Sequence, residues 1–213
     1  MLPHDAAKNV NLVWAAIKEE YTKLKSPSRY GDLRPTMFRP SGETFPNLKG
    51  RANDLRHFGA PLLAVWKRFM DSRNKIHRFV KLLLEASVEI ERLVDKNIGG
   101  HRYPRADAKR FEDMCFQYAS STTALANFYH PRNIWLFHYT IKFHYLLHIG
   151  QTSGQDSPSQ GWCYQGEDFM QKTKTLVQSS CRGSPAEVVA NKVLAKYIVG
   201  LSYANMHRDS WWR

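Results

Sequence analysis

Apolar residues recur at three- and four-residue steps along much of the chain, and this spacing is typical of one face of an α-helix. The first such segment covers residues 6–25, and Asp5 lies where a carboxylate would cap its N-terminus. The same pattern predicts further helices over residues 104–129, 134–149, 167–182 and 184–204. No two alternating segments are joined by an Asn-Gly or Asp-Gly turn, the strongest short sign of a β-hairpin. We therefore expect an all-α protein, a bundle of six or seven helices.

The longest uninterrupted apolar pattern lies between Pro61 and Ile98. Steps of four and three residues, counted from Leu62, meet apolar side chains with only two polar breaks, which is a heptad pattern. The pattern predicts one long central helix over about 61–98, ended by two glycines. A break near residues 71–72, with Ser72 capping a second helix, is the alternative.

Residues 26–50 contain four prolines and three glycines, so no long helix can form there. We expect a long irregular connection, and connections of this length are usually either functional or mobile. The chain has 213 residues, enough to bury a sizeable core. The prediction is a single helical domain over 1–213.

The charge of the chain is strongly positive, because 31 lysines and arginines face 19 acidic residues, a formal net charge of +12. The excess is uneven: residues 1–110 hold 22 basic and 12 acidic residues, whereas residues 111–213 hold 9 and 7. A surplus of this size favours a polyanionic partner such as DNA or RNA. We expect the binding surface to lie in the first half of the chain.

Segment 67–81 carries six basic residues and one acidic residue. On a helix, several of these cations lie broadly opposite the apolar residues, and such a stripe can follow the phosphates of a nucleic acid. An ordinary solvated helix face is the alternative. The residues predicted to contact phosphate here are Lys67, Arg68, Arg73, Lys75, Arg78 and Lys81.

The irregular connection and the residues just after it form a second basic segment. Its cations alternate with Tyr30, Phe38 and Phe45, a combination that suits single-stranded nucleic acid because rings stack on bases. The alternative is an ordered surface loop whose rings dock on the core. The predicted binding residues of this arm are Arg29, Arg34, Arg39, Lys49, Arg51 and Arg56.

Three histidines, His138, His144 and His148, lie in the predicted helix over 134–149. His144 and His148 are four residues apart and share a helix face, a spacing used by zinc-binding helices. His138 points about 120° away from His144 on the same helix. A third metal ligand would have to come from Cys163, Cys181, Asp168 or His130. We expect structural histidines packed inside the bundle, with metal binding and proton transfer by the pair as alternatives.

The sequence contains no Gly-rich phosphate loop, no Gly-x-Ser-x-Gly elbow and no Cys-x-x-Cys pair. We therefore predict no cofactor, and a binding protein rather than an enzyme. Three cysteines, an odd and sparse number, favour a reducing compartment. The first residues lack the features of a signal peptide, and the most apolar stretch is too short to span a bilayer. We expect an intracellular protein without a transmembrane segment.

The leading hypothesis from these patterns is a nucleic-acid-binding protein that mainly contacts phosphates. The second is a structural or assembly subunit, in which the heptad-patterned helix over 61–98 contacts another protein or a second copy of the chain. The third is a metal-dependent enzyme that uses His144 and His148.

Overall fold

The computed structural model describes residues 5–38, 45, 46, 48, 50, 52–159 and 173–206. Every regular element among them is a helix, which confirms the all-α class. The chain divides into two compact units, residues 1–161 and 162–213, and each is described by itself. The prediction of one domain over the whole chain stays a prediction.

Helix α1 spans Ala6–Lys23 and is capped as predicted. The Asp5 carboxylate accepts hydrogen bonds from the backbone amides of Ala7 and Lys8, at 2.9 and 3.3 Å. These bonds satisfy two amides that have no acceptor inside the helix. The helix ends earlier than predicted because Lys25 has a φ of 50°, in the left-handed region that a right-handed helix does not use.

The predicted long central helix over 61–98 is wrong, because the structure has two helices there. Helix α4 spans Gly59–Phe69 and helix α5 spans Lys75–Lys96. Between them the Asp71 carboxylate accepts a hydrogen bond from the Arg73 amide at 2.9 Å. Side chains that bond to the nearby backbone in this way compete with helical hydrogen bonds. The break lies close to the predicted alternative at 71–72.

The cap of α5 is Asn74 rather than the predicted Ser72. Its side-chain oxygen accepts hydrogen bonds from the amides of Ile76 and His77, at 2.9 and 3.4 Å. Asparagine is among the best N-cap residues because its short side chain reaches the free amides of the first turn.

Replacing Asn74 with alanine is expected to lower the free energy of unfolding by about 1 kcal/mol, because the first amides of α5 lose their acceptor. Urea unfolding followed by circular dichroism measures this change. Ser72→Ala is the matched control, since no hydrogen bond to the Ser72 hydroxyl caps the helix. Equal losses in the two variants would contradict the assignment of the cap.

The irregular connection predicted over 26–50 is partly docked on α1. It includes a short helix α2, Pro35–Phe38, and is followed by helix α3, Ala52–Arg56. The Tyr30 amide donates a hydrogen bond to the Tyr21 hydroxyl at 3.1 Å. One core cluster therefore contains residues from α1, the connection and α4. Its buried members are Ala16, Ile17, Tyr21, Tyr30, Leu33, Phe58 and Val65.

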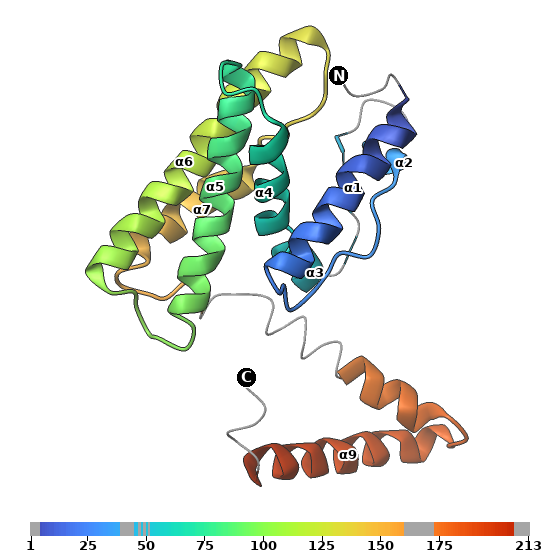
Figure 1. Cartoon of the computed structure of the whole chain (residues 1–213). Coiled ribbons are helices and arrows are strands. Elements are labelled where there is room, and N and C mark those ends of the chain that lie inside the picture. The colour runs from blue at the N-terminus through green and yellow to red at the C-terminus, as the bar shows by residue number, and fades with distance from the viewer. Residues whose placement is uncertain are drawn as a thin grey trace. The chain divides into compact units, whose positions relative to one another are not determined.

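Helix α6 spans Arg105–Tyr129 and agrees with the predicted helix over 104–129. Figure 1 shows α6, α5, α4 and α1 side by side in this order, and each neighbouring pair is in contact. A second buried group lies mainly on α5 and α6. Its members are Ala86, Leu93, Val94, Tyr103, Phe111, Met114, Cys115, Ala119, Leu125 and Ala126.

The predicted helix over 134–149 begins later than expected. A 3₁₀ turn, η1, spans His130–Arg132, and helix α7 spans Ile141–Thr152. Asn133, a residue type that often caps helices, has a φ of 58° and ends the 3₁₀ turn. Asparagine adopts this left-handed conformation more readily than most residues. The segment between Asn133 and α7 has no regular secondary structure.

Helix α7 packs against α6 at a close approach. A Cβ atom at Gly150 would lie 3.2 Å from the Cβ of Cys115, so the absence of a side chain lets the two helices meet. The ends of this helix pair are also joined: the Tyr103 amide donates to the Ser153 carbonyl at 2.9 Å, and the Ser157 amide donates to the His101 carbonyl at 2.8 Å. Gly150 therefore lies inside α7 and does not end it.

The second unit contains a helix over 173–181 and helix α9, Ala186–Met206. Gly183, with a φ of 65°, forms the turn between them. The Lys196 ammonium donates a hydrogen bond to the Ser179 hydroxyl at 2.9 Å, so α9 folds back on the preceding helix. The beginning of the predicted helix over 167–182 lies outside the described residues.

Candidate nucleic-acid interface

The basic segment 67–81 forms the junction between α4 and α5. Its turn is fixed by the His77 ring, whose Nδ1 accepts a hydrogen bond from the Asp71 amide at 3.0 Å. The Trp66 indole donates to the His77 carbonyl at 3.0 Å, and the two rings meet edge to face at 5.3 Å. Because neutral hydrogen bonds and ring packing both hold this turn, the start of α5 has a defined position next to α4.

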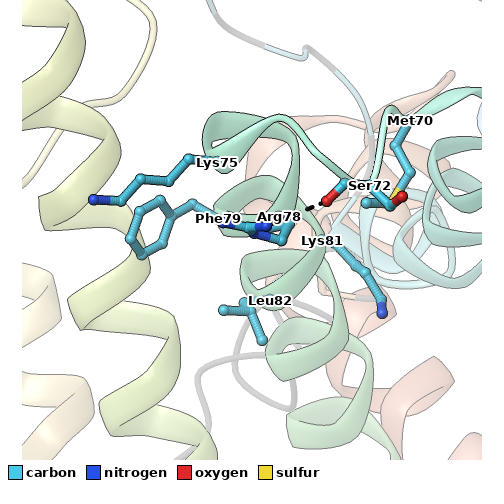
Figure 2. Close-up of a pocket in the computed structure, with 7 residues that line it drawn as sticks. All are labelled: Met70, Ser72, Lys75, Arg78, Phe79, Lys81 and Leu82. Atoms are coloured by element: carbon cyan, nitrogen blue, oxygen red, sulfur yellow. Dashed lines mark hydrogen bonds between the residues drawn. The ribbon is translucent and has the colours of Figure 1, made fainter.

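An open hollow of about 340 Å³ lies at this junction and is lined by both apolar and basic side chains. Figure 2 shows Arg78 directed toward the Ser72 carbonyl, to which its guanidinium donates a hydrogen bond at 3.4 Å. The Lys75 and Lys81 ammonium groups extend in different directions, so they do not converge on one point. The residues that line the hollow are Met70, Ser72, Lys75, Arg78, Phe79, Lys81 and Leu82.

Some of the predicted cations have carboxylate partners. Lys67 and Lys81 share Glu85, at 2.8 and 3.7 Å, so one acidic residue faces two lysines. Arg68 lies 3.5 Å from Glu19, and both side chains are more than half exposed. Exposed pairs of this kind contribute little to stability and are screened by salt. These cations are therefore only partly neutralised.

The remaining cations of the segment are more open. The Arg73 side chain is 92% exposed and lies 3.6 Å from Asp71. Among the described residues, no carboxylate lies within 4.0 Å of Lys75 or Arg78. The six cations of the segment face three described carboxylates, Glu19, Asp71 and Glu85, which leaves an excess of positive charge at the junction.

An exposed ring next to this surface was not predicted as a site residue. Phe69 is 55% exposed at the end of α4, and the Arg68 guanidinium lies 5.2 Å from the centre of its ring. The heptad pattern places Phe69 on the buried face of a long helix, and the end of α4 at this residue removes that cover. A prediction of the helix break at 71–74 would have indicated that the Phe69 ring is exposed.

One residue of the second basic segment, Arg56, forms ion pairs inside the protein. Arg56 is only 15% exposed, and its guanidinium pairs with Glu91 at 2.7 Å and with Asp95. Arg34 pairs with Asp32 at 3.2 Å, and Arg29 is exposed. Three predicted residues, Arg39, Lys49 and Arg51, lie outside the described residues.

Two rings of this arm, those of Tyr30 and Phe45, pack against other residues of the protein. Tyr30 is 4% exposed, within the core cluster. The Phe45 ring stacks on the His138 ring at 4.2 Å between ring centres. The Phe38 side chain lies outside the described part of the chain. For Tyr30 and Phe45, docking inside the protein therefore agrees with the alternative interpretation of this arm.

The histidines of the 134–149 stretch are exposed, so the prediction that they pack inside the bundle is wrong. His144 and His148 do share a face of α7, and their Nε2 atoms lie 3.0 Å apart. His130 instead bonds the Phe137 carbonyl at 2.6 Å. Among the described residues, no three potential metal ligands cluster. Two of the residues considered as third ligands, Cys163 and Asp168, lie outside that part.

The buried cysteine of α6 is not a reactive group. Cys115 has no exposed surface and no disulfide partner. Burial raises the pKa of its thiol to about 12, and Glu112 adds to this effect by repelling a negative charge. The thiol is therefore protonated at neutral pH, and a protonated thiol is a poor nucleophile.

Comparison with known proteins adds no assignment to these observations: no protein-family model, curated protein or solved structure matches the chain. Within the described residues, none of the helices combines the length and apolar character needed to cross a bilayer.

Proposed function

We propose that the protein binds nucleic acid through the α4–α5 junction, with Arg73, Lys75 and Arg78 as the main phosphate contacts. The observation that carries the proposal is that Lys75 and Arg78 line an open hollow, and no described carboxylate lies within 4.0 Å of either side chain. Such cations replace the counterions of a phosphate backbone, and the release of these ions drives binding.

The spread of the charges supports a polymeric partner over a small anion. The ammonium groups of Lys75 and Lys81 extend in different directions (Figure 2), which suits successive phosphates along a strand. The exposed Phe69 ring beside Arg68 can stack on an unpaired base. We therefore expect single strands to bind more tightly than a duplex of the same length.

Fluorescence anisotropy with labelled single- and double-stranded DNA and RNA, over a salt series from about 50 to 200 mM, tests the proposal. The logarithm of the binding constant is expected to fall linearly with the logarithm of the salt concentration. The double variant Lys75→Gln/Arg78→Gln removes two phosphate contacts. It should therefore reduce the slope by about 1.4–1.8.

The matched control removes the same charge elsewhere. Arg92→Gln/Arg110→Gln neutralises two exposed arginines that pair with Glu89, at 2.7 and 3.2 Å, away from the junction. Its slope and affinity should stay close to those of the original protein. Equal weakening by both double variants would show a general effect of net charge and contradict the assigned surface. Absence of any salt-dependent binding would contradict the function itself.

The assembly hypothesis relied on one continuous helix over 61–98. The structure does not support this premise, because the heptad pattern is divided between α4 and α5. A stable oligomer in sedimentation velocity, combined with no affinity for nucleic acid, would favour that hypothesis over the one proposed here.

A further inference from the structure

Helix α7 presents two histidine side chains in a chelating arrangement. His144 and His148 are one turn apart, and their rings meet edge to face with centres 4.4 Å apart. The Nε2 atoms, the ring nitrogens farthest from the backbone, face each other at 3.0 Å. Both side chains are exposed, so an ion from solvent can reach the two nitrogens.

The separation of the nitrogens fits two bonds to one transition-metal ion. Nitrogens 3.0 Å apart, each about 2.0–2.1 Å from a common ion, subtend an angle of about 95° at that ion. This angle is near the right angle of square-planar or tetragonal coordination and smaller than the tetrahedral angle that structural zinc sites use. Tetragonal sites with nitrogen and oxygen ligands are typical of Cu²⁺ and Ni²⁺.

We propose that His144 and His148 form a bidentate surface site for a divalent transition metal of this class, with Cu²⁺ bound most tightly. Imidazole suits these ions, and affinity for a given set of ligands is highest for Cu²⁺ in the first-row series. Within the part of the chain that the structure describes, no third ligand lies in the same cluster, so the proposed site uses these two nitrogens. The site is independent of the proposed nucleic-acid surface, which lies on α4 and α5.

Metal binding requires a lone pair on both Nε2 atoms. A hydrogen bond across the 3.0 Å contact requires that one ring donates its Nε2 proton to the Nε2 atom of the other ring. A neutral imidazole carries its single proton on either nitrogen. On binding, the donating ring therefore changes tautomer, its proton lies on Nδ1, and both Nε2 atoms bond to the metal without a net loss of protons from the pair.

Isothermal titration of the full-length protein with Cu²⁺, in a buffer that does not chelate metal, tests the site. One high-affinity equivalent is expected, with nitrogen hyperfine coupling from two imidazoles in the electron paramagnetic resonance spectrum. His144→Gln and His148→Gln should each weaken this binding roughly tenfold or more, because the second bond of a chelate forms intramolecularly. Ni²⁺ and Zn²⁺ should bind more weakly than Cu²⁺.

Two controls separate the chelate from ordinary histidine binding. His138→Gln removes an exposed histidine outside the pair and should leave the high-affinity equivalent unchanged. The double variant His148→Gln/Ile149→His keeps the number of histidines but places the second one on another face of the helix, since Ile149 is exposed and five residues from His144. It should bind as weakly as the single variants. Full affinity in this variant, or in either single variant with unchanged helix content, would overturn the proposal.

Discussion

Replacing Phe111 with alanine is expected to lower the free energy of unfolding by about 3–5 kcal/mol. The side chain is 2% exposed in the core around α6, and its ring meets that of Tyr103 edge to face at 5.3 Å. The substitution removes the transfer energy of a large apolar group and leaves a cavity that the surrounding helices fill only partly. Guanidinium or urea unfolding followed by circular dichroism measures the change.

Phe116 provides the matched control, because it is the same residue type on the same helix but is 65% exposed. Phe116→Ala should change the free energy of unfolding by no more than about 0.5 kcal/mol, as most exposed substitutions do. Similar losses in the two variants would show that α6 does not bury the face that contains Phe111.

Arg56→Ala is expected to lower the free energy of unfolding by about 2–3 kcal/mol. Removing one partner of a fully buried ion pair costs about 3–5 kcal/mol, and the cost is smaller here because Glu91 and Asp95 keep 32% and 53% of their side-chain surface exposed. Arg56 connects α3 to two acidic residues of α5, Glu91 and Asp95, so the loss affects two charge-assisted hydrogen bonds.

The loss of unfolding free energy in Arg56→Ala should depend on pH. Burial raises the pKa of Glu91 above its ordinary value of 4.5, and the hydrogen bond from Arg56 opposes this shift. Without Arg56 the pKa of Glu91 rises further, so the folded state binds the proton more tightly than the unfolded state. Stability then falls as the pH rises from about 4.5 through the raised pKa of Glu91. The variant should be closer to the original protein at pH 4.5 than at neutral pH.

Arg34→Ala is the control for this prediction, because its pair with Asp32 is 70% and 52% exposed. Its effect on the free energy of unfolding should be within about 0.5 kcal/mol at either pH. If Arg56→Ala were equally mild, the guanidinium would not stabilise the contact between α3 and α5. The residue would then be available for the role predicted from the sequence.

The apolar pattern predicted most helices because periodicity over many residues reports a buried face. It failed over 61–98, where the same pattern continues through two helices. The decisive signals there were short polar side chains: Asp71 and Asn74 bond to backbone amides and end one helix and begin the next. Such side-chain hydrogen bonds replace helical ones through a few local atoms, so a seven-residue apolar repeat does not reveal them.

The start of α7 could not be placed for a similar reason. Asn133 is a good N-cap residue and also one of the few residues that adopt a left-handed conformation. Its sequence position does not distinguish the two roles, and the structure shows the second. Gly150 presents the same problem. Glycine often ends a helix, but here the absence of a side chain lets α7 pack closely against Cys115 of α6.

The candidate surface was predictable from composition only in outline. Charge counts indicated segment 67–81, but they could not show which cations have internal partners, because these partners are distant in sequence. Arg56 pairs with residues 35 and 39 positions away, and such pairing depends on the fold that brings Arg56 of α3 close to α5. Lys75 and Arg78, in contrast, are exposed at the start of α5 and line the hollow.

Two backbone hydrogen bonds join the chain just before α6 to the chain just after α7. The ends of this segment, near residues 101–103 and 153–157, already meet, so the segment is a loop closed at its base. Because these bonds hold the base, we expect it to keep its position when the chain is lengthened or shortened at η1, the far end of the loop (Figure 1). Evolution can therefore alter the surface around η1 without disturbing the route of the chain from α5 into α6.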